Sequence, residues 1–247
     1  MSRRAGLAWW AAALPLLPLV LPLAVRTRRT ALRLAPAAGA RQGLAGQPSS
    51  TEPLRLLLLG ESTVAGVGAS CLQFALAGRL ASALAAQLQR PVAWSALGEN
   101  GITLGEACER LLPQVDRADY DLVVLVFGVN DSTGLTSAKR WRTGWQRLIG
   151  HFQQHGAQVV CTAVPPLRHF SALPWLLRQL LGRRAEWLDT QLRTVAEAQG
   201  AGYSAVSLAM RPDYLAMDGY HPSALGYQVW AEQLAHWLVD TQRASVS

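Results

Sequence analysis

Short apolar segments alternate along most of the chain with longer segments whose apolar residues recur at helical spacing. The first of the short segments consists of four leucines, at 56–59, and it runs into Gly60. A short apolar run that ends at turn residues is typical of a buried strand in a parallel sheet. The same pattern predicts further strands at 91–97, 121–127, 157–164 and 202–207.

Apolar residues at helical spacing predict a helix after each of these strands, at 71–89, 103–112, 137–155, 171–199 and 223–239. Thr103 and Glu106 have the spacing of a capping box, which favours a helix that begins there. Pro174 and Gly182 are candidate breaks in the fourth helix. Strands that alternate with helices predict an α/β fold, a three-layer α/β/α sandwich with a mainly parallel five-stranded sheet.

The beginning of the chain has a different pattern. Residues 5–25 contain no charged residue, and arginines flank them on both sides. This apolar stretch is about long enough to cross a bilayer, although three prolines interrupt it. It is interpreted as an uncleaved membrane anchor, as a signal peptide cleaved near 38–40 that leaves an exported domain, or as neither. Because arginines directly after an apolar stretch hinder export, we expect an anchor.

The arginines also bear on orientation, and the composition changes again after them. Basic residues are slightly more numerous after the apolar stretch than before it, so the positive-inside rule favours a cytoplasmic domain but leaves the side of the membrane open. Residues 34–52 are rich in Ala, Gly, Pro, Gln and Ser and lack periodicity, which predicts a flexible linker. We therefore expect an anchor or signal segment at 1–33, this linker, and a folded domain at 53–242.

The net charge of +7 does not indicate a nucleic-acid-binding domain. Seven of the 23 Lys and Arg residues, but one of the 16 acidic residues, lie within 1–52, so the rest of the chain is almost neutral. The three cysteines, Cys71, Cys108 and Cys161, are far apart and lack the spacing of a disulfide framework or a zinc site. We interpret each of them as a small buried apolar residue.

Candidate chemistry begins at Ser62, two residues after the leucine segment and its glycine. Open α/β sheets bind ligands beyond the carboxyl ends of their strands. A serine hydroxyl is a weak nucleophile unless a neighbouring base takes its proton. His221 is a suitable base because imidazole titrates near neutrality, and Asp218 lies close enough in the chain to orient its ring.

Acyl transfer also needs hydrogen-bond donors that stabilise the oxyanion of the tetrahedral intermediate. Backbone N–H groups in glycine loops suit this role, since no side chain blocks close approach. The candidates are the amides of Ser62 and Gly101 and the side-chain amide of Asn130, with Gly98 as the alternative to Gly101.

Four blocks of the sequence together resemble the SGNH (GDSL-like) serine hydrolases. They are Gly60-Glu61-Ser62, Gly101, Gly128-Val129-Asn130-Asp131 and Asp218-Gly219-Tyr220-His221-Pro222. Each block is a weak signal alone, but their order and spacing match the family over residues 54–240. One departure is Glu61, which stands where the family usually has Asp; the sequence does not explain it.

The resemblance implies a flavodoxin-like fold and hydrolysis of esters or thioesters without a metal or cofactor. By the same resemblance, Ser62 is the nucleophile, His221 the base and Asp218 the residue that orients it. The oxyanion hole is then formed by Ser62, Gly101 and Asn130.

We therefore expect a membrane-associated, lipase- or esterase-like enzyme that acts on a small ester, a lipid or an acylated glycan. Two alternatives stay open: an enzyme that removes or transfers O-acetyl groups on a cell-envelope glycan, and a catalytically idle module that binds lipid or carbohydrate. Residues 168–184 combine aromatic residues and leucines with arginines. They are interpreted as an amphipathic helix packed on the core, or as a lid or membrane-facing surface beside the acyl site.

Overall fold

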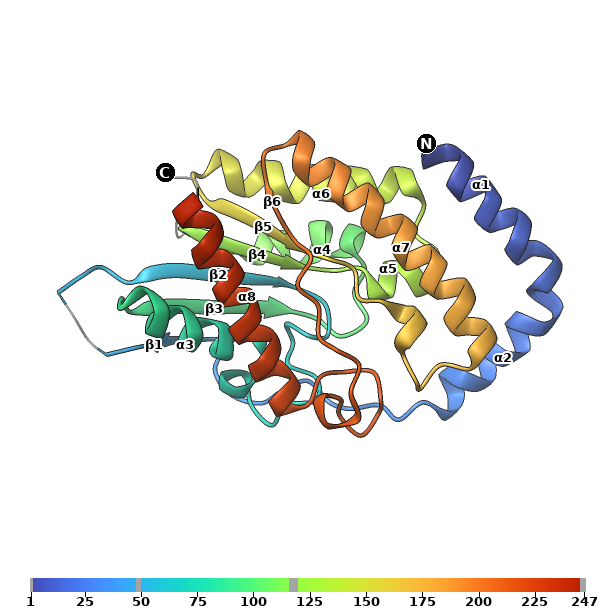
Figure 1. Ribbon diagram of the computed structural model, residues 1–247, viewed down its shortest axis with the longest axis horizontal. Helices are drawn as coiled ribbons and strands as arrows, with labels where there is room; N and C mark the ends of the chain where they lie inside the picture. Colours follow the sequence, from blue (N-terminus) through green and yellow to red (C-terminus); the bar gives the residue numbers. More distant parts are fainter. Residues whose placement is uncertain (1, 48–49, 116–119, 245–247) are drawn as a thin grey trace.

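The computed structural model describes residues 2–47, 50–115 and 120–244, with side chains from Gly6 onward. Its centre is a six-stranded sheet with the strand order β1-β3-β2-β4-β5-β6 (Figure 1). The strands are β1 (Gln42–Ala45), β2 (Leu54–Gly60), β3 (Val92–Gly98), β4 (Leu122–Val126), β5 (Gln158–Thr162) and β6 (Gly202–Ser204). All neighbouring strands run parallel except β1, which is antiparallel to β3.

The prediction of a five-stranded sheet is therefore wrong by one strand, while the predicted α/β class is confirmed. The sixth strand, β1, lies in the segment that the sequence predicts to be a flexible linker. Gln42 lies opposite Ser95 and Ala45 opposite Val92. Three of the four β1 residues are exposed, so the strand has almost no apolar pattern of its own. It is held by backbone hydrogen bonding to the edge of β3, which a hydrophobicity pattern does not reveal.

Helices cover both faces of the sheet, as predicted for a three-layer sandwich. The longer ones in the domain are α3 (Leu76–Leu88), α4 (Leu104–Arg110), α6 (Ala138–Gln154), α7 (Trp175–Ala198) and α8 (Ala224–Ala244). Alternate residues of β2 enter two separate cores: Leu56 and Leu58 pack with α3 and α8, and Leu57 and Leu59 pack with α4, α6 and α7. Because both faces of the strand are buried, its sequence is a continuous run of leucines.

Two helix predictions differ from the structure in detail. The first turn of the predicted helix 71–89 is a separate 3-10 helix (Leu72–Phe74), since Ala75 has an extended backbone. Helix α7 is not broken at Gly182. A Cβ at Gly182 would lie 2.9 Å from Cβ of Arg168, so this glycine allows the preceding loop to pack closely against the helix. The capping box of Thr103 and Glu106 is confirmed at the start of α4.

The N-terminal segment forms α1 (Ser2–Ala13), a 3-10 turn (Leu14–Leu16) and α2 (Leu17–Thr30), which lie beside α7 (Figure 1). The indole N–H of Trp9 donates to the carbonyl of Leu180 at 2.8 Å, and these two residues form a small buried cluster with Ala13. Residues 6–30 are long and apolar enough to cross a membrane, and most of their surface is exposed. This finding fits an anchor and a signal peptide equally.

Candidate active site

Ser62 lies in the turn after β2, at the carboxyl edge of the sheet. The turn is fixed by its own backbone, because the amides of Val64 and Ala65 donate to the carbonyl of Glu61, and the amide of Val67 donates to the carbonyl of Ser62. Ser62 is 8% exposed, and it lines a cavity of about 560 Å³. The backbone that carries Ser62 is thus fixed by hydrogen bonds, and the residue lines the cavity.

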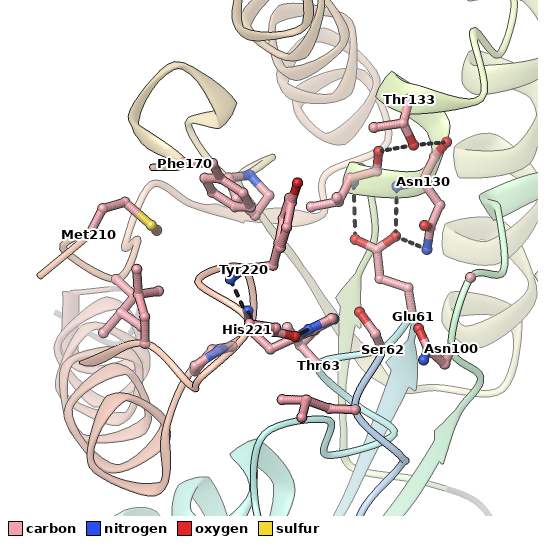
Figure 2. A pocket seen from close by; sticks show the side chains of 18 of the residues that line it. Glu61, Ser62, Thr63, Asn100, Asn130, Thr133, Phe170, Met210, Tyr220 and His221 are labelled. Atoms are coloured by element: carbon pink, nitrogen blue, oxygen red, sulfur yellow. Dashed lines mark hydrogen bonds and ion pairs between the residues drawn. The ribbon is translucent and has the colours of Figure 1, made fainter. Parts of the chain in front are cut away.

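The loop before α8 brings Asp218 and His221 into the same cavity. The Asp218 carboxylate lies 2.6 Å from Nδ1 of His221 and also accepts from the amides of Tyr220 and His221. An ionised carboxylate only accepts hydrogen bonds, so Nδ1 carries the proton and Nε2 stays free to act as a base. Figure 2 shows the His221 ring directed towards Ser62.

The pKa of Asp218 lies below its ordinary value. Burial alone would raise the pKa of this carboxyl, but the hydrogen bonds from the His221 ring and from the amides of Tyr220 and His221 favour the charged form and prevail. The carboxylate therefore stays ionised at neutral pH. A negative charge at this point favours the imidazolium form of His221 that would follow proton transfer from a serine.

Glu61, directly before Ser62, is buried and holds Asn130 in place (Figure 2). Its carboxylate accepts the amide of Val129 at 3.0 Å, the amide of Asn130 at 3.1 Å and the side-chain amide of Asn130 at 2.7 Å. Glu61 therefore joins the turn after β2 to the start of α5 (Val129–Thr133), which follows β4. This contact gives the unusual glutamate a structural role.

Asn130 differs from a free oxyanion donor in one respect. Its side-chain amide donates to Glu61 and also to the carbonyl of Ile102, at 3.0 Å. Because both partners are hydrogen-bond acceptors, the side chain of Asn130 must present its amide nitrogen, and not its oxygen, to them. Both N–H bonds are thus engaged, so donation to an oxyanion requires one of these hydrogen bonds to be shared or released. The backbone amides of Ser62 and Gly101, by contrast, donate to no backbone carbonyl within the described ranges.

The structure separates the two candidate glycines of the loop after β3. Gly101 has φ +87°, a conformation that favours glycine, and it lines the cavity. Gly98 ends β3 opposite Gly60, and a Cβ there would collide with the amide of Ala65. Gly98 therefore serves close packing of the loop against the serine turn, whereas the position of Gly101 suits an oxyanion donor.

Burial raises the pKa of Glu61 to about 7, although the amides of Asn130 and Val129 donate to its charged form. The negative charge of the neighbouring Asp131 contributes to this rise in the pKa. Asp131 itself is fully buried and accepts the amide of Leu104, so it fixes the start of α4. These two acids stabilise the loops around the site, and Glu61 also lines its cavity.

The cavity has an apolar wall opposite the polar loops. Its apolar residues come from the loops after β5 and β6 and from α8; they include Phe170, Leu208, Met210, Leu215 and Trp230. The hydroxyl of Thr63 and the indole N–H of Trp230 are buried in the cavity lining and have no hydrogen-bond partner among the described residues. Neither position carries a local sequence signal.

One part of the cavity lining is unexpected from the sequence. Arg28, Leu32, Arg33 and Leu34, at the end of α2 and just after it, line the cavity that contains Ser62. Sequence patterns divide these residues between an anchor and a linker. Only the folded chain shows that they lie at the site.

Residues 168–184 form part of the core for most of their length. Phe170, Leu173, Leu177 and Leu180 are buried, whereas Trp175 is exposed at the start of α7. From Trp175 onward the segment is a helix that packs on the core, as in the first interpretation, while Phe170 before it lines the cavity and Trp175 is exposed.

Comparisons with known proteins identify a matching family and solved structures of similar fold. The model of the GDSL-like lipase/acylhydrolase family matches residues 58–229. A comparison with curated proteins finds no match. Among solved structures, a psychrotrophic esterase from Pseudoalteromonas sp. is similar with a TM-score of 0.60 and 17% identity, over 77% of this chain and 99% of that chain.

Two further solved structures are similar at comparable levels. A lipase/acylhydrolase from Enterococcus faecalis has a TM-score of 0.56 and 19% identity, over 74% of this chain and 94% of that one. An acetyl xylan esterase from Geobacillus stearothermophilus has a TM-score of 0.56 and 15% identity, over 72% and 90%. At such identities these structures show a shared fold.

Proposed function

Because the chain belongs to the GDSL-like lipase/acylhydrolase family, we propose that it cleaves carboxylic esters or thioesters through an acyl-enzyme on Ser62. The observation that carries this proposal is the 2.6 Å contact between Asp218 and Nδ1 of His221, in the cavity that Ser62 lines. A carboxylate, an imidazole with a free Nε2 and a serine in one cavity are the groups that acyl transfer requires.

The reaction begins when Oγ of Ser62 attacks the acyl carbon and its proton passes to Nε2 of His221. The carbonyl oxygen becomes an oxyanion, which accepts from the amides of Ser62 and Gly101 and from Asn130. When the intermediate collapses, the leaving alcohol or thiol takes the proton from His221. Water then attacks the acyl-serine with His221 again as base, and the carboxylic acid is released.

The apolar wall supports acyl chains longer than acetyl, since each buried methylene contributes about 0.8 kcal/mol. Acetyl groups on a glycan would leave that wall unfilled. A panel of acetyl, octanoyl and palmitoyl esters tests this choice. We expect the highest kcat/KM for one of the two longer chains, and a preference for acetyl would favour a deacetylase instead.

Replacement of Ser62 tests the nucleophile. We expect Ser62→Ala to lower kcat/KM for a soluble ester roughly 10³-fold or more and to abolish covalent labelling by a fluorophosphonate. Ser207→Ala is the matched control, because Ser207 lines the same cavity; this variant should keep both labelling and turnover. Labelling of a folded Ser62→Ala protein would contradict the assignment.

We also propose that residues 5–25 anchor the protein to a membrane, which their exposed apolar surface supports. The alternative is export after cleavage near 38–40. In the folded chain, Ala37 and Ala38 donate to the carbonyls of Ala65 and Ser70, so cleavage there would remove contacts made by the domain. Mass spectrometry of the mature protein from membranes decides: an intact N-terminus supports the anchor, and a chain that begins near residue 40 excludes it.

A further inference from the structure

The apolar helix α2 ends at the opening of the cavity that contains Ser62, which we call the mouth of the active site. Helix α2 ends at Thr30, and Leu32 and Leu34 already line the cavity that contains Ser62. A chain spans at most about 3.5 Å per residue, so the four residues from Thr30 to Leu34 cover no more than about 14 Å. A membrane that holds the helix therefore holds the active site at its surface.

The domain is also fixed in orientation at this point. Shortly after the cavity lining, the amide of Ala37 donates to the carbonyl of Ala65 at 3.0 Å, and the amide of Leu72 donates to the carbonyl of Ala38 at 2.9 Å. The chain is thus tied to α2 on one side of the mouth and to the domain on the other. This short connection keeps the mouth on the side of the molecule that faces the helix.

Apolar side chains around the mouth suit contact with lipid. Leu32 is 51% exposed, Trp175 is 66% exposed, and Met217, directly before Asp218, is 83% exposed. Pro174, the neighbour of Trp175, lines a smaller cavity together with Leu23 of α2 and Asp218. Tryptophan is enriched where a protein meets the membrane–water interface. These residues give the mouth an apolar rim beside the apolar helix.

Two arginines are the other feature of the mouth. Arg28 and Arg33 are exposed, line the cavity, and form no ion pair with any residue that the structure describes. A guanidinium binds phosphate oxygens through paired N–H donors. The buried acids of the cavity already accept other hydrogen bonds, Glu61 from the amide of Val129 and Asp218 from the amide of Tyr220, which leaves the arginines free for a ligand.

We propose that Arg28 and Arg33 form a binding site for the phosphate of a membrane lipid whose acyl ester lies at Ser62. The acyl chain then packs on the wall of Phe170, Leu208 and Trp230. This rests on the proposed ester hydrolysis and names its substrate: a lipid with an ester-linked acyl chain and a phosphate-bearing headgroup. Hydrolysis adds water across the ester and releases a fatty acid and the headgroup-bearing alcohol.

The test uses the full-length protein in dodecyl maltoside micelles that contain either monooleoylglycerol or monooleoylglycerol phosphate, which differ only in the phosphate. We expect Arg28→Gln/Arg33→Gln to lower kcat/KM for the phosphate ester about tenfold or more and to leave the neutral ester within about twofold. The matched control is Arg29→Gln/Arg41→Gln, which removes the same charge at two exposed positions that line neither this cavity nor the smaller one beside it. It should leave both rates unchanged.

Equal losses on the two esters, or an equal effect of the two double variants, would overturn the proposal. A water-soluble butyrylglycerol phosphate tests whether the substrate must be a lipid. If the protein hydrolyses it as fast as the oleoyl compound, a lipid substrate is excluded. Para-nitrophenyl butyrate, which carries no phosphate, distinguishes a failure of the headgroup site from a failure of ester hydrolysis itself. If Ser62 hydrolyses it but the phosphate has no effect, the headgroup site alone fails; if the protein hydrolyses no ester, both proposals fail.

Discussion

The base and the mouth of the active site are built in opposite ways. At the base, Glu61, Asn130, Asp218 and the serine turn are buried or half-buried and joined by short hydrogen bonds within one domain. At the mouth, Arg28, Leu32 and Arg33 are exposed and belong to the segment that follows an apolar helix. In the function proposed above, the chemistry belongs to the domain, and the choice of substrate belongs to a segment outside its core.

The largest effect should come from the base of the site. Asp218→Asn would place an amide N–H or an uncharged oxygen opposite Nδ1 of His221, and it would no longer favour the imidazolium. We expect kcat for a soluble ester to fall roughly 10²- to 10⁴-fold with little change in KM. Steady-state kinetics measure this, with circular dichroism as the control for folding. A fall below about threefold would show that His221 does not depend on Asp218.

Asn130 and Glu61 provide the next largest effect. We expect Asn130→Ala and Glu61→Gln each to lower kcat roughly 10- to 100-fold, because each removes or misplaces one oxyanion donor. If Glu61 acts by positioning Asn130, the double variant loses no more than Asn130→Ala alone. A double-mutant cycle in kcat measures this coupling. Fully additive losses would mean that Glu61 acts by another route.

Glu61 also predicts how stability depends on pH. Its folded pKa of about 7 lies above the ordinary value of 4.5, so between these values the folded protein binds more protons than the unfolded chain. Stability contributed by this group is therefore present below about pH 4.5 and is lost as pH rises through 7, a change of about 3 kcal/mol. Urea unfolding at several pH values measures it, and Glu61→Gln should flatten this part of the profile. An unchanged profile in the variant would contradict the assignment.

The smallest effect concerns the rim of the mouth. We expect Trp175→Ser to lower turnover of a micellar long-chain ester a few-fold, since it removes an interfacial contact of about 1–2 kcal/mol, and to leave a soluble ester unchanged. Leu44→Ser is the control, because Leu44 is a similarly exposed apolar residue on the edge strand β1. Equal effects of the two variants on the micellar ester would show that Trp175 makes no specific contact with the lipid at the mouth.

The α/β class and most of the helices and strands are predictable from the amino-acid pattern. Leu56 to Leu59 are predictable as a buried strand because both of its faces are covered, which demands a continuous apolar run. The assignment of Ser62, Asp218 and His221 as catalytic residues rests on the order of four short motifs and stays a prediction. The structure brings these three residues to one cavity.

Other features depend on contacts between segments that are distant in the chain, and a local pattern does not contain them. Strand β1 exists because the edge of β3 offers hydrogen-bond partners, and Gly182 is required because the loop before α7 folds back and brings Arg168 against it. Glu61 is explained only by the amides of Val129 and Asn130, far away in the chain. The arginines of the mouth likewise gain their position from packing. Contacts between distant segments depend on the fold, and periodicity along the chain records only which side of each element is buried.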